Sequence, residues 1–476
     1  MAIVNSQYVE RYLIPSVLFV LALSLRLHGL GQRSMWNDEM FTLKLVRHPW
    51  NDFWYAVFFE RTRWHPPFFF VLEKVVVQVL GTTEFALRFL PAVSGALTVP
   101  VLYVLLLQRY KTTTAILGAT LLAISTYHIA YSQEARPYSL AILITSLAAT
   151  LLVAPTTRKF VWIALINLVG LYTHYWYGLV MIALLVVPST PALRKHYLAT
   201  CIVSGVLFIP QLFVLGQQSK QLAEATWWCA DPPRLQNLWW TFLAFCSVRF
   251  MQASAMFEVS FVVQIVVSCA AAVGTALAWK HGRVYVLLVL VPVCMGFLIS
   301  LALPQFYVWY RYPIIVLPFF LGMLAVGIDS LKGNFAKALL VVLLVASSGF
   351  ALVRYQNWEK GNMKSVAAYV ESVSMNSGVA IIRPWYLADL FEYYYRGFGK
   401  PMEETYDTDS LQLQLHDVNR IVLVSQDTPN NLRDWLGEHY RLVERKAFPG
   451  EKGMGVEVDV YAVERCDPKG IESDRK

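Results

Sequence analysis

Residues 12–30, YLIPSVLFVLALSLRLHGL, form a nearly unbroken apolar run close to the start of the chain. A helix of about 20 apolar residues is long enough to cross the hydrocarbon core of a bilayer. No small-residue cleavage site follows this run, so we expect a retained transmembrane helix and not a removed signal peptide. Similar runs recur along the chain, and the sequence therefore predicts an α-helical polytopic membrane protein.

The composition agrees with this fold class. Of the 476 residues, 57% are hydrophobic and only 15% are charged, whereas a soluble domain is about 25% charged. Many of the basic residues behind the net charge of +8 lie in short connectors between apolar runs. We therefore expect membrane lipid, and no nucleic acid, as a partner.

The basic connectors also set the expected orientation. They lie around residues 109–111, 158–159, 194–196, 280–283 and 332–337. Placing them in the cytoplasm, by the positive-inside rule, predicts a multi-pass plasma (inner) membrane protein with a cytoplasmic N-terminus. About eleven spans are expected, at roughly residues 11–30, 88–107, 114–131, 138–154, 160–174, 176–191, 198–216, 256–279, 284–303, 312–330 and 337–353.

One shorter apolar run, residues 68–80, does not fit this alternation. It carries Glu73 and Lys74, and counting it as a span would place the connector at 109–111 outside. We expect instead an interfacial helix at the outer membrane surface. This helix belongs to a long outer loop, residues 31–87.

The composition changes after residue 354. Strand-like runs at 378–382, 420–425 and 456–463 alternate with helix-like runs at 363–373 and 431–439. This pattern is typical of a small α/β domain. We therefore expect a transmembrane domain over residues 1–354 and an extracytoplasmic α/β domain over residues 355–476.

The stretch SMWNDEMFT, residues 34–42, places two adjacent carboxylates, Asp38 and Glu39, at the membrane edge. Carboxylates at such a position cost desolvation free energy unless they have partners. Other outer loops supply polar and basic side chains where the expected spans meet the outer face. These are His65, Glu134, Arg136, His174 and Arg311.

Acids beside cations in one outer cavity suit a particular reaction. A carboxylate takes the proton from an attacking hydroxyl or amine, and cations stabilise a phosphate leaving group. The membrane supplies the lipid that carries this phosphate. The residues therefore point to a transfer enzyme that uses a lipid-linked donor.

The same residues carry a family resemblance. An apolar run is followed by S-x-W-x-D-E, W-H-P-P, F-A-L-R-F-L-P, Y-S-Q-E-A-R-P-Y, Y-T-H-Y and R-Y-x-x-x-x-L-P. This order, over residues 10–330, resembles the C-type superfamily of membrane glycosyltransferases. It is most similar to the bacterial relatives of the protein O-mannosyltransferases and the lipid A aminoarabinose transferases, of glycosyltransferase family 39.

The resemblance implies a single sugar on a polyprenyl phosphate as the donor and inversion at the anomeric carbon. It implies that Asp38 is the general base and that Glu134 is a second active-site carboxylate, with Glu39 completing the acidic pair. Arg136, Arg311 and His65 are the candidates for the donor phosphate, and His174 and Tyr138 are candidates for substrate contact. The acceptor, whether protein, lipid or glycan, stays open, as does the sugar.

Some relatives hold a divalent cation near the donor phosphate, and others use arginine and lysine alone. A Mg²⁺ or Mn²⁺ cofactor therefore stays open, with Asp38, His65 and Glu134 as its candidate ligands. Where some relatives have lysine before the proline of the first loop, this chain has His65. An unperturbed histidine is mostly neutral at pH 7, which weakens the case for a fixed cation there.

Each site residue also has a structural interpretation. Asp38 and Glu39 suit the first turn of a helix, and Glu134 with Arg136 suits an ion pair. His174 suits an aromatic belt, and Arg311 suits a side chain that reaches lipid phosphates. Two other functions also stay open: a ligase or polymerase acting on a lipid-linked glycan, and a flippase for a lipid-linked sugar.

Overall fold

The structure is a computed structural model. It describes residues 7–59, 65–153, 156–225, 232–246, 257–303, 306–356, 361–374, 378–397, 402–403, 415, 418–426, 431–450 and 455–462. The chain divides into two compact units. The helical unit comprises Met1–Gln32 and Phe41–Asn357, and the sheet unit comprises Arg33–Met40 and Trp358–Lys476.

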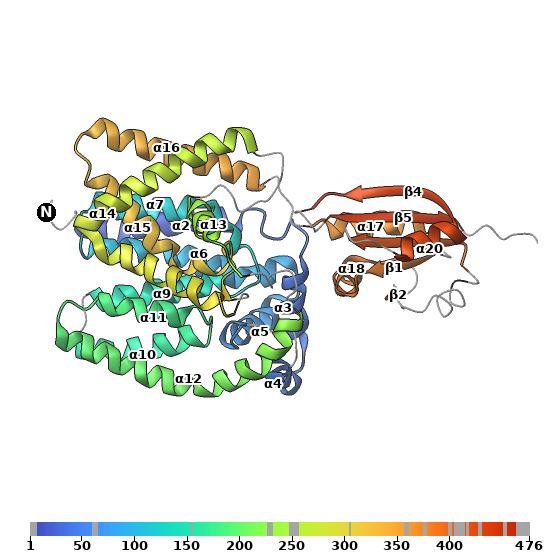
Figure 1. The fold of residues 1–476 in the computed structure, drawn as a ribbon, viewed down its shortest axis with the longest axis horizontal. Coiled ribbons are helices and arrows are strands. Elements are labelled where there is room, and N and C mark those ends of the chain that lie inside the picture. The colour runs from blue at the N-terminus through green and yellow to red at the C-terminus, as the bar shows by residue number, and fades with distance from the viewer. Residues whose placement is uncertain are drawn as a thin grey trace, which may run out of the picture. The chain divides into compact units, whose positions relative to one another are not determined.

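The helical unit contains the candidate membrane spans (Figure 1). Among the described residues, five helical stretches are long and apolar enough to cross a bilayer: Glu84–Leu107, Pro191–Gly216, Ile265–Ser300, Tyr312–Asp329 and Asn334–Gln356. A bent pair of helices brings this number to six, and Tyr138–Val153 and Tyr177–Val186 are shorter apolar helices. The chain is thus a polytopic helical membrane protein, and the total of eleven spans stays a prediction.

The described residues between 7 and 356 are mostly helical. In chain order the elements are η1 (Val9–Leu13), α2 (Ile14–Leu27), α3 (Asn37–Arg47), α4 (Trp50–Phe59), α5 (Phe68–Leu80), α6 (Glu84–Leu107), α7 (Thr112–Ile124), α8 (Thr126–Ser132), α9 (Tyr138–Val153), α10 (Thr157–Leu171), α11 (Tyr177–Ala183), η2 (Leu184–Val186), α12 (Pro191–Ala225), α13 (Leu235–Phe245), α14 (Phe257–Ser300), η6 (Tyr312–Val316), α15 (Leu317–Asp329) and α16 (Asn334–Gln356).

The predicted span 114–131 is broken in the structure. Helix α7 ends at Ile124, and α8 starts at Thr126 after a bend of 56°. Ser125, between them, has an extended backbone, and its hydroxyl accepts a hydrogen bond from the His128 backbone N–H. Serine favours such a helix cap over a helix interior, which explains the break.

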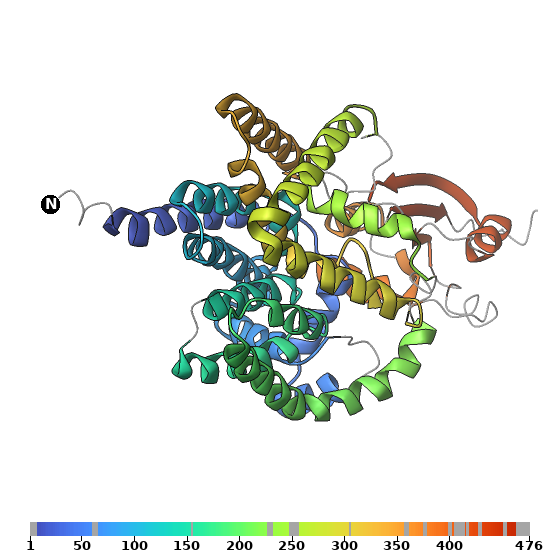
Figure 2. The same cartoon turned by 60° about the vertical axis from the view of Figure 1, so that its left-hand side comes forward.

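The predicted spans 256–279 and 284–303 correspond to the two parts of α14, Phe257–Ser300. These are two helices that meet at a kink, where Gly282 has a non-helical backbone (φ −152°, ψ 38°). The predicted basic connector at 280–283 lies at this kink. Helix α12 is also long, contains Pro210 and packs against α10 along a curved path (Figure 2).

Helix α5 has the bounds predicted for the interfacial run, Phe68–Leu80. Glu73 and Lys74 are both buried against the rest of the helical unit. Lys74 donates hydrogen bonds to the backbone carbonyls of Val46 and His48, at the end of α3. The two charges that disfavour a span therefore lie on a helix face that packs against protein.

Close helix packing forms the core of this unit. Helix α6 packs against α2, α7 and α9, and α15 packs against α14 and α7. A Cβ added at Gly327 would lie 2.5 Å from the backbone of Gly274, so α15 and α14 nearly touch at this point. Small residues allow this kind of approach between helices in membranes.

The sheet unit is a small α/β fold. Its strands are β1 (Gly378–Arg383), β2 (Met402–Glu403), β3 (Arg420–Gln426), β4 (Arg441–Phe448) and β5 (Val456–Ala462), and its helices are α17 (Met363–Ser374), η8 (Trp385–Leu387), α18 (Ala388–Tyr394) and α20 (Asn431–His439). The order of the strands is β2-β1-β3-β5-β4, with β1 parallel to β2 and β3 and with β5 antiparallel to β3 and β4.

The structure confirms the predicted strands, apart from Val463, which lies outside the described residues. Strand β4, with sequence RLVERKAF, was not predicted, because its residues are polar or exposed almost throughout. It is the last strand in the order, and its one ladder of backbone hydrogen bonds is with β5. An edge strand of this kind has no apolar alternation that a sequence would reveal.

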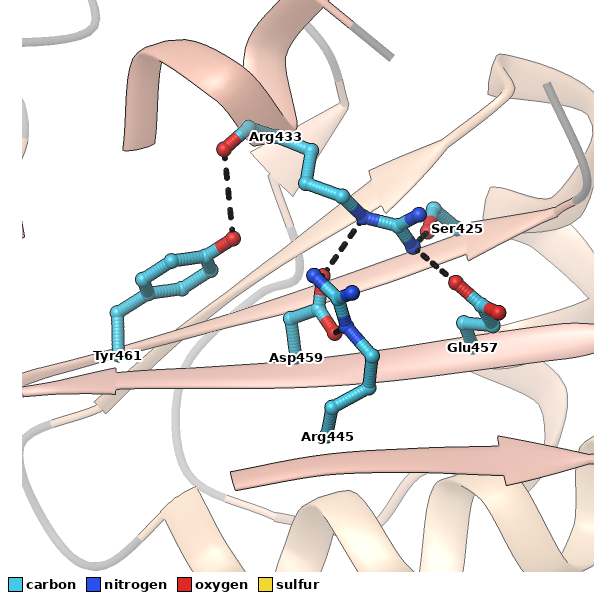
Figure 3. A network of polar contacts seen from close by, with 6 residues as sticks. All are labelled: Ser425, Arg433, Arg445, Glu457, Asp459 and Tyr461. Atoms are coloured by element: carbon cyan, nitrogen blue, oxygen red, sulfur yellow. Dashed lines mark hydrogen bonds and ion pairs between the residues drawn. The ribbon is translucent and has the colours of Figure 1, made fainter. Parts of the chain in front are cut away.

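A network of charged side chains joins β3, β4, β5 and α20 (Figure 3). The Asp459 carboxylate is fully buried and lies 2.7 Å from Arg433 Nε and 2.6 Å from Arg445 Nε. Arg433 also contacts Glu457 at 2.6 Å. The hydrogen bond to Asp459 raises the pKa of Arg445. These pairs compensate the buried carboxylate. The packing of Leu432 and Leu436 in the apolar core also holds α20 against the sheet.

Candidate active site

Four segments of the helical unit meet at the candidate site. They are the turn before α5 at 65–67, the loop from 133 to 138, the turn after α10 at 172–176 and the segment 306–312. The Phe68 N–H donates to the Tyr172 carbonyl at 2.9 Å, and the Trp176 indole donates to the Phe306 carbonyl at 2.7 Å. These hydrogen bonds tie together loops that are far apart in the sequence.

A cluster of rings lies where the four segments meet. The ring centroids of His65 and His174 are 5.0 Å apart, and each lies 5.7 Å from the Tyr138 ring. The Tyr312 ring lies 5.4 Å from His174. The predicted residues His65, Tyr138 and His174 are therefore brought together, and each comes from a different segment.

The backbone next to Arg311 is also fixed. Tyr127 and Tyr131, on α8, both donate hydrogen bonds to the Tyr310 carbonyl, at 2.9 and 2.6 Å. The Arg311 guanidinium lies 5.4 Å from the centroid of the Tyr310 ring. Helix α8, which leads into the Glu134–Arg136 loop, therefore also positions the segment that carries Arg311.

Both histidines direct ring nitrogens into this cluster. The Trp176 backbone N–H donates to His174 Nδ1 at 3.2 Å. Because Nδ1 accepts, the proton of the neutral ring lies on Nε2. Within the described part of the chain, His174 Nε2 and His65 Nδ1 are buried and have no hydrogen-bond partner. Buried polar atoms usually have a hydrogen-bond partner, so these two nitrogens are open to a water or a ligand.

The electrostatic environment keeps these histidines neutral. Burial lowers the pKa of His65 well below its usual value, and the charges of Arg136 and Arg311 lower it further, as does His174. Burial, together with the charge of Arg136, lowers the pKa of His174 to about 3. The site thus combines two neutral imidazoles with two arginine charges close by, an environment that attracts an anion.

Glu134 lies in the same loop and is only 7% exposed. The Arg136 backbone N–H donates to the Glu134 carbonyl at 2.7 Å, which forms a tight turn. The Thr42 hydroxyl, on α3, donates to the Ala135 carbonyl at 3.0 Å. The loop that carries Glu134 and Arg136 is therefore held directly by Thr42, the last residue of the SMWNDEMFT stretch.

Asp38 and Glu39 lie in the first turn of α3. They belong to the segment Arg33–Met40, which is part of the sheet unit. There the Met35 N–H donates to the Tyr394 hydroxyl at 2.7 Å, and the Lys364 N–H donates to the Ser34 hydroxyl. Glu39 is only 1% exposed. The position of Asp38 and Glu39 in the first turn of α3 also agrees with a structural role, since acidic side chains stabilise the start of a helix.

The described side chains fit an anion better than a metal cation. Among them, no three residues of His, Cys, Asp or Glu are arranged to hold a metal ion. Arg136 and Arg311 act on His65 as positive charges, which disfavours a cation beside that ring. We therefore derive no step of the reaction through a metal.

Two residues of the site were not predicted. Tyr312 joins the ring cluster, although only its neighbour Arg311 drew notice in the sequence. Lys74 holds the end of α3, where the sequence suggested only that its charge disfavours a span. The signal for Tyr312 was its place in the R-Y-x-x-x-x-L-P motif, and that for Lys74 was a lysine inside an apolar run.

Comparisons with known proteins agree with this description. The family model described as dolichyl-phosphate-mannose-protein mannosyltransferase matches residues 64–214. A search of curated proteins finds no match. The helical unit's loops at 65–67, 133–138 and 172–176 all lie within the residues that the family model matches.

Solved structures share the fold over nearly the whole chain. ArnT from Cupriavidus metallidurans in the apo state has a TM-score of 0.56 at 12% identity, covering 93% of this chain and 97% of that one. The same protein bound to undecaprenyl phosphate has a TM-score of 0.54 at 13% identity, with the same coverage. The archaeal oligosaccharyltransferase AglB from Archaeoglobus fulgidus, with an inhibitory peptide and a dolichol-phosphate, has a TM-score of 0.50 at 11% identity, covering 97% of this chain and 75% of that one.

At these identities the solved structures show the fold alone. Together with the family model, they confirm the resemblance expected from the sequence motifs. In both its motifs and its fold, this chain resembles the C-type superfamily of membrane glycosyltransferases.

Proposed function

We propose that this protein is an inverting glycosyltransferase that moves one sugar from a polyprenyl-phosphate donor to an acceptor at the outer face of the membrane. The observation that carries this proposal is the cluster of His65 and His174 with Arg136 and Arg311 close by. Neutral N–H donors and arginines together suit a phosphate group. Undecaprenyl phosphate and dolichol-phosphate in the ArnT and AglB structures support a polyprenyl carrier.

In the proposed mechanism the phosphate is bound by Arg136, Arg311 and the histidines, with the sugar beside Tyr138. The acceptor oxygen or nitrogen attacks the anomeric carbon, and the bond from that carbon to the phosphate oxygen breaks. The polyprenyl phosphate leaves with the electron pair, and its negative charge is stabilised by the arginines. The proton of the acceptor passes to Asp38 as general base.

The sequence resemblance supports this role for Asp38, which belongs to the S-x-W-x-D-E motif after the first apolar run. Glu134 is proposed as the second carboxylate, which orients the acceptor or the sugar.

The two other functions have less support. A flippase is expected to carry its charges near the bilayer midplane, in paired broken helices. In this chain the candidate residues for substrate binding lie in turns at the ends of helices, at 65–67, 133–138, 172–176 and 306–312. A ligase for lipid-linked glycans would use a diphosphate carrier, and the donor assay below separates it from a transferase for single sugars.

The test of the function uses purified protein and a panel of radiolabelled polyprenyl-phosphate sugars. We expect one label to leave the lipid, and Asp38→Asn to slow this transfer by about 10² to 10⁴-fold, the usual cost of losing a general base. Asp52→Asn, on the exposed face of α4, is the matched control. Transfer by Asp38→Asn at the parent rate would show that Asp38 is not the base, and label that leaves only a diphosphate carrier would identify a ligase.

Arg311→Gln tests the donor site. It removes one charge from the phosphate contact, so we expect the KM for the donor to rise by on the order of tenfold to 10²-fold. Arg194→Gln removes the same charge from the exposed start of α12 and should leave the KM unchanged. Equal effects of the two variants on the KM would mean that Arg311 acts only through the net charge.

The lowered pKa values predict a pH dependence of stability. Below pH 6.5 a histidine of the unfolded chain binds a proton, whereas folded His174 stays neutral down to about pH 3. The unfolded state then binds more protons, so the free energy of unfolding falls as the pH falls through this window, by up to about 1.4 kcal/mol per pH unit for one histidine. We expect the melting temperature in detergent to drop from pH 7 to pH 5.

The control for this experiment is a pair of variants. His174→Gln should show a shallower drop in melting temperature than the parent, because the titrating group is gone. His196→Gln, on the exposed side of α12, should follow the parent. A drop that is equally steep in all three proteins would assign the pH dependence to other groups.

The orientation is part of the proposal. With eleven spans, the N-terminus lies on the cytoplasmic side of the plasma membrane and the sheet unit lies on the outer side. A cysteine placed at Tyr110, between α6 and α7, should then resist an impermeant thiol reagent added to intact cells, whereas one at Asp434 should react. Reaction at position 110 with protection at position 434 would reverse the orientation.

A further inference from the structure

A second polar cluster lies next to the candidate site, and its centre is Arg26, in the last turn of α2. This side chain is fully buried in the helical unit. A buried arginine is costly unless hydrogen bonds compensate its charge, and inside a membrane domain such a residue usually has a function. The proposed reaction makes no use of Arg26.

The guanidinium of Arg26 has four hydrogen-bond contacts. Nη1 donates to the carbonyls of Ala22 at 2.9 Å and Ala123 at 3.2 Å. Nη2 donates to the carbonyl of Leu122 at 3.3 Å and to His128 Nδ1 at 2.7 Å. Within the described residues, these partners are carbonyl oxygens and an imidazole nitrogen, not a carboxylate. The side chain therefore donates its hydrogen bonds to backbone carbonyls and to one histidine.

Two of these carbonyls belong to the last turn of α7. The final carbonyls of a helix have no partner within it, and they form the negative end of the helix dipole. In a membrane domain each such group must be satisfied by the protein itself. Arg26 thus caps α7 at the break before Ser125, where the chain bends by 56° into α8.

The far end of α8 is tied to the same part of α2. Gln133 follows α8 directly, and its side-chain amide donates to the carbonyls of Arg26 at 2.8 Å and His28 at 2.9 Å. The Tyr355 hydroxyl, on α16, donates to the Gln133 side-chain oxygen at 2.9 Å. Because α8 is only seven residues long, these contacts fix both of its ends.

Close packing on a third side leaves this cluster little freedom. A Cβ added at Gly95, on α6, would lie 2.1 Å from the Ser132 hydroxyl oxygen and 3.1 Å from Arg26 Nε. Helix α6 therefore passes directly against α8 and the guanidinium. Ser132 is held in turn by a hydrogen bond of 2.6 Å to the His128 carbonyl. A shift of α8 would require several of these contacts to change together.

We propose that Arg26, acting with His128 and Gln133, is a positioning residue for the Glu134–Arg136 loop. The guanidinium fixes the bend between α7 and α8, and α8 leads directly into the loop at the site. Tyr127 and Tyr131 on α8 hold the Tyr310 carbonyl, so the same helix also positions Arg311. The consequence for catalysis rests on the proposed function, whereas the anchoring of the loop does not.

His128 allows a matched test. An arginine can only donate, so His128 Nδ1 must accept the hydrogen bond from Arg26. Asparagine has a side-chain oxygen at nearly the position of Nδ1, and it can accept the same hydrogen bond. Leucine has a comparable size and no acceptor. His128→Asn and His128→Leu therefore differ mainly in the contact with Arg26.

The first measurement is hydrogen–deuterium exchange of the segment 133–139 in detergent. In His128→Leu we expect exchange at least about tenfold faster than in the parent, because a hydrogen bond to a charged group is lost. In His128→Asn we expect the parent rate. Exchange in α15 serves as a reference that the helical unit stays folded. Parent-like exchange in His128→Leu, with α15 protected, would overturn the proposal.

The second measurement is sugar transfer. We expect His128→Leu to lose on the order of 10²-fold in rate, the cost of misplacing reacting groups by about 1 Å, and His128→Asn to recover most of it. In an Arg136→Gln background His128→Leu should cost far less, because residues that act as a unit are not additive. An equal loss in both backgrounds would indicate a general structural defect and overturn the proposal.

The two measurements distinguish a failure of the proposed function from a failure of the proposed positioning role. If the parent transfers no sugar from any donor, the proposed function fails, and the exchange rates still decide whether Arg26 and His128 anchor the loop. If exchange responds as expected but His128→Leu transfers sugar at the parent rate, the anchoring has no part in the reaction. The positioning role is then overturned.

Discussion

Polar groups inside a membrane domain must find their partners within the protein, and this constraint shapes the candidate site. Several backbone carbonyls around the site accept hydrogen bonds from other segments of the helical unit. Phe68 donates to the carbonyl of Tyr172, and Tyr127 and Tyr131 donate to that of Tyr310. These hydrogen bonds hold the segments of the site together, and an active site requires groups held in fixed positions.

The histidine at position 65 has an electrostatic consequence for the site. Arg136 and Arg311 already make the site positive, and a third cation would add repulsion between buried charges. His65, kept neutral by burial and by these arginines, still offers a hydrogen bond without adding charge. Under the proposed function, the phosphate is then recognised by two charges and by the geometry of neutral donors. A site with less positive charge also releases the spent carrier phosphate more easily.

The sequence predicted well what depends on local pattern. The helix at 68–80 and the three predicted strands follow from runs of apolar residues, and the structure confirms these elements. Its place at the membrane interface stays a prediction. Strand β4 was missed because its polar, exposed residues carry no alternation. The break at Ser125 was missed because an apolar run hides a single cap. No local pattern marks Arg26, since three of its hydrogen-bond partners lie about a hundred positions away in the sequence.

The placement of the candidate residues divides the proposed reaction between two parts of the chain. His65, Arg136, His174 and Arg311, which suit the donor phosphate, all lie in the helical unit. Asp38, the proposed base, lies in the segment Arg33–Met40, which packs with the sheet unit. Helix α3 is continuous through both, and Thr42 anchors it beside Glu134. Under the proposed function, the residues that hold the donor phosphate therefore depend on packing contacts within the helical unit.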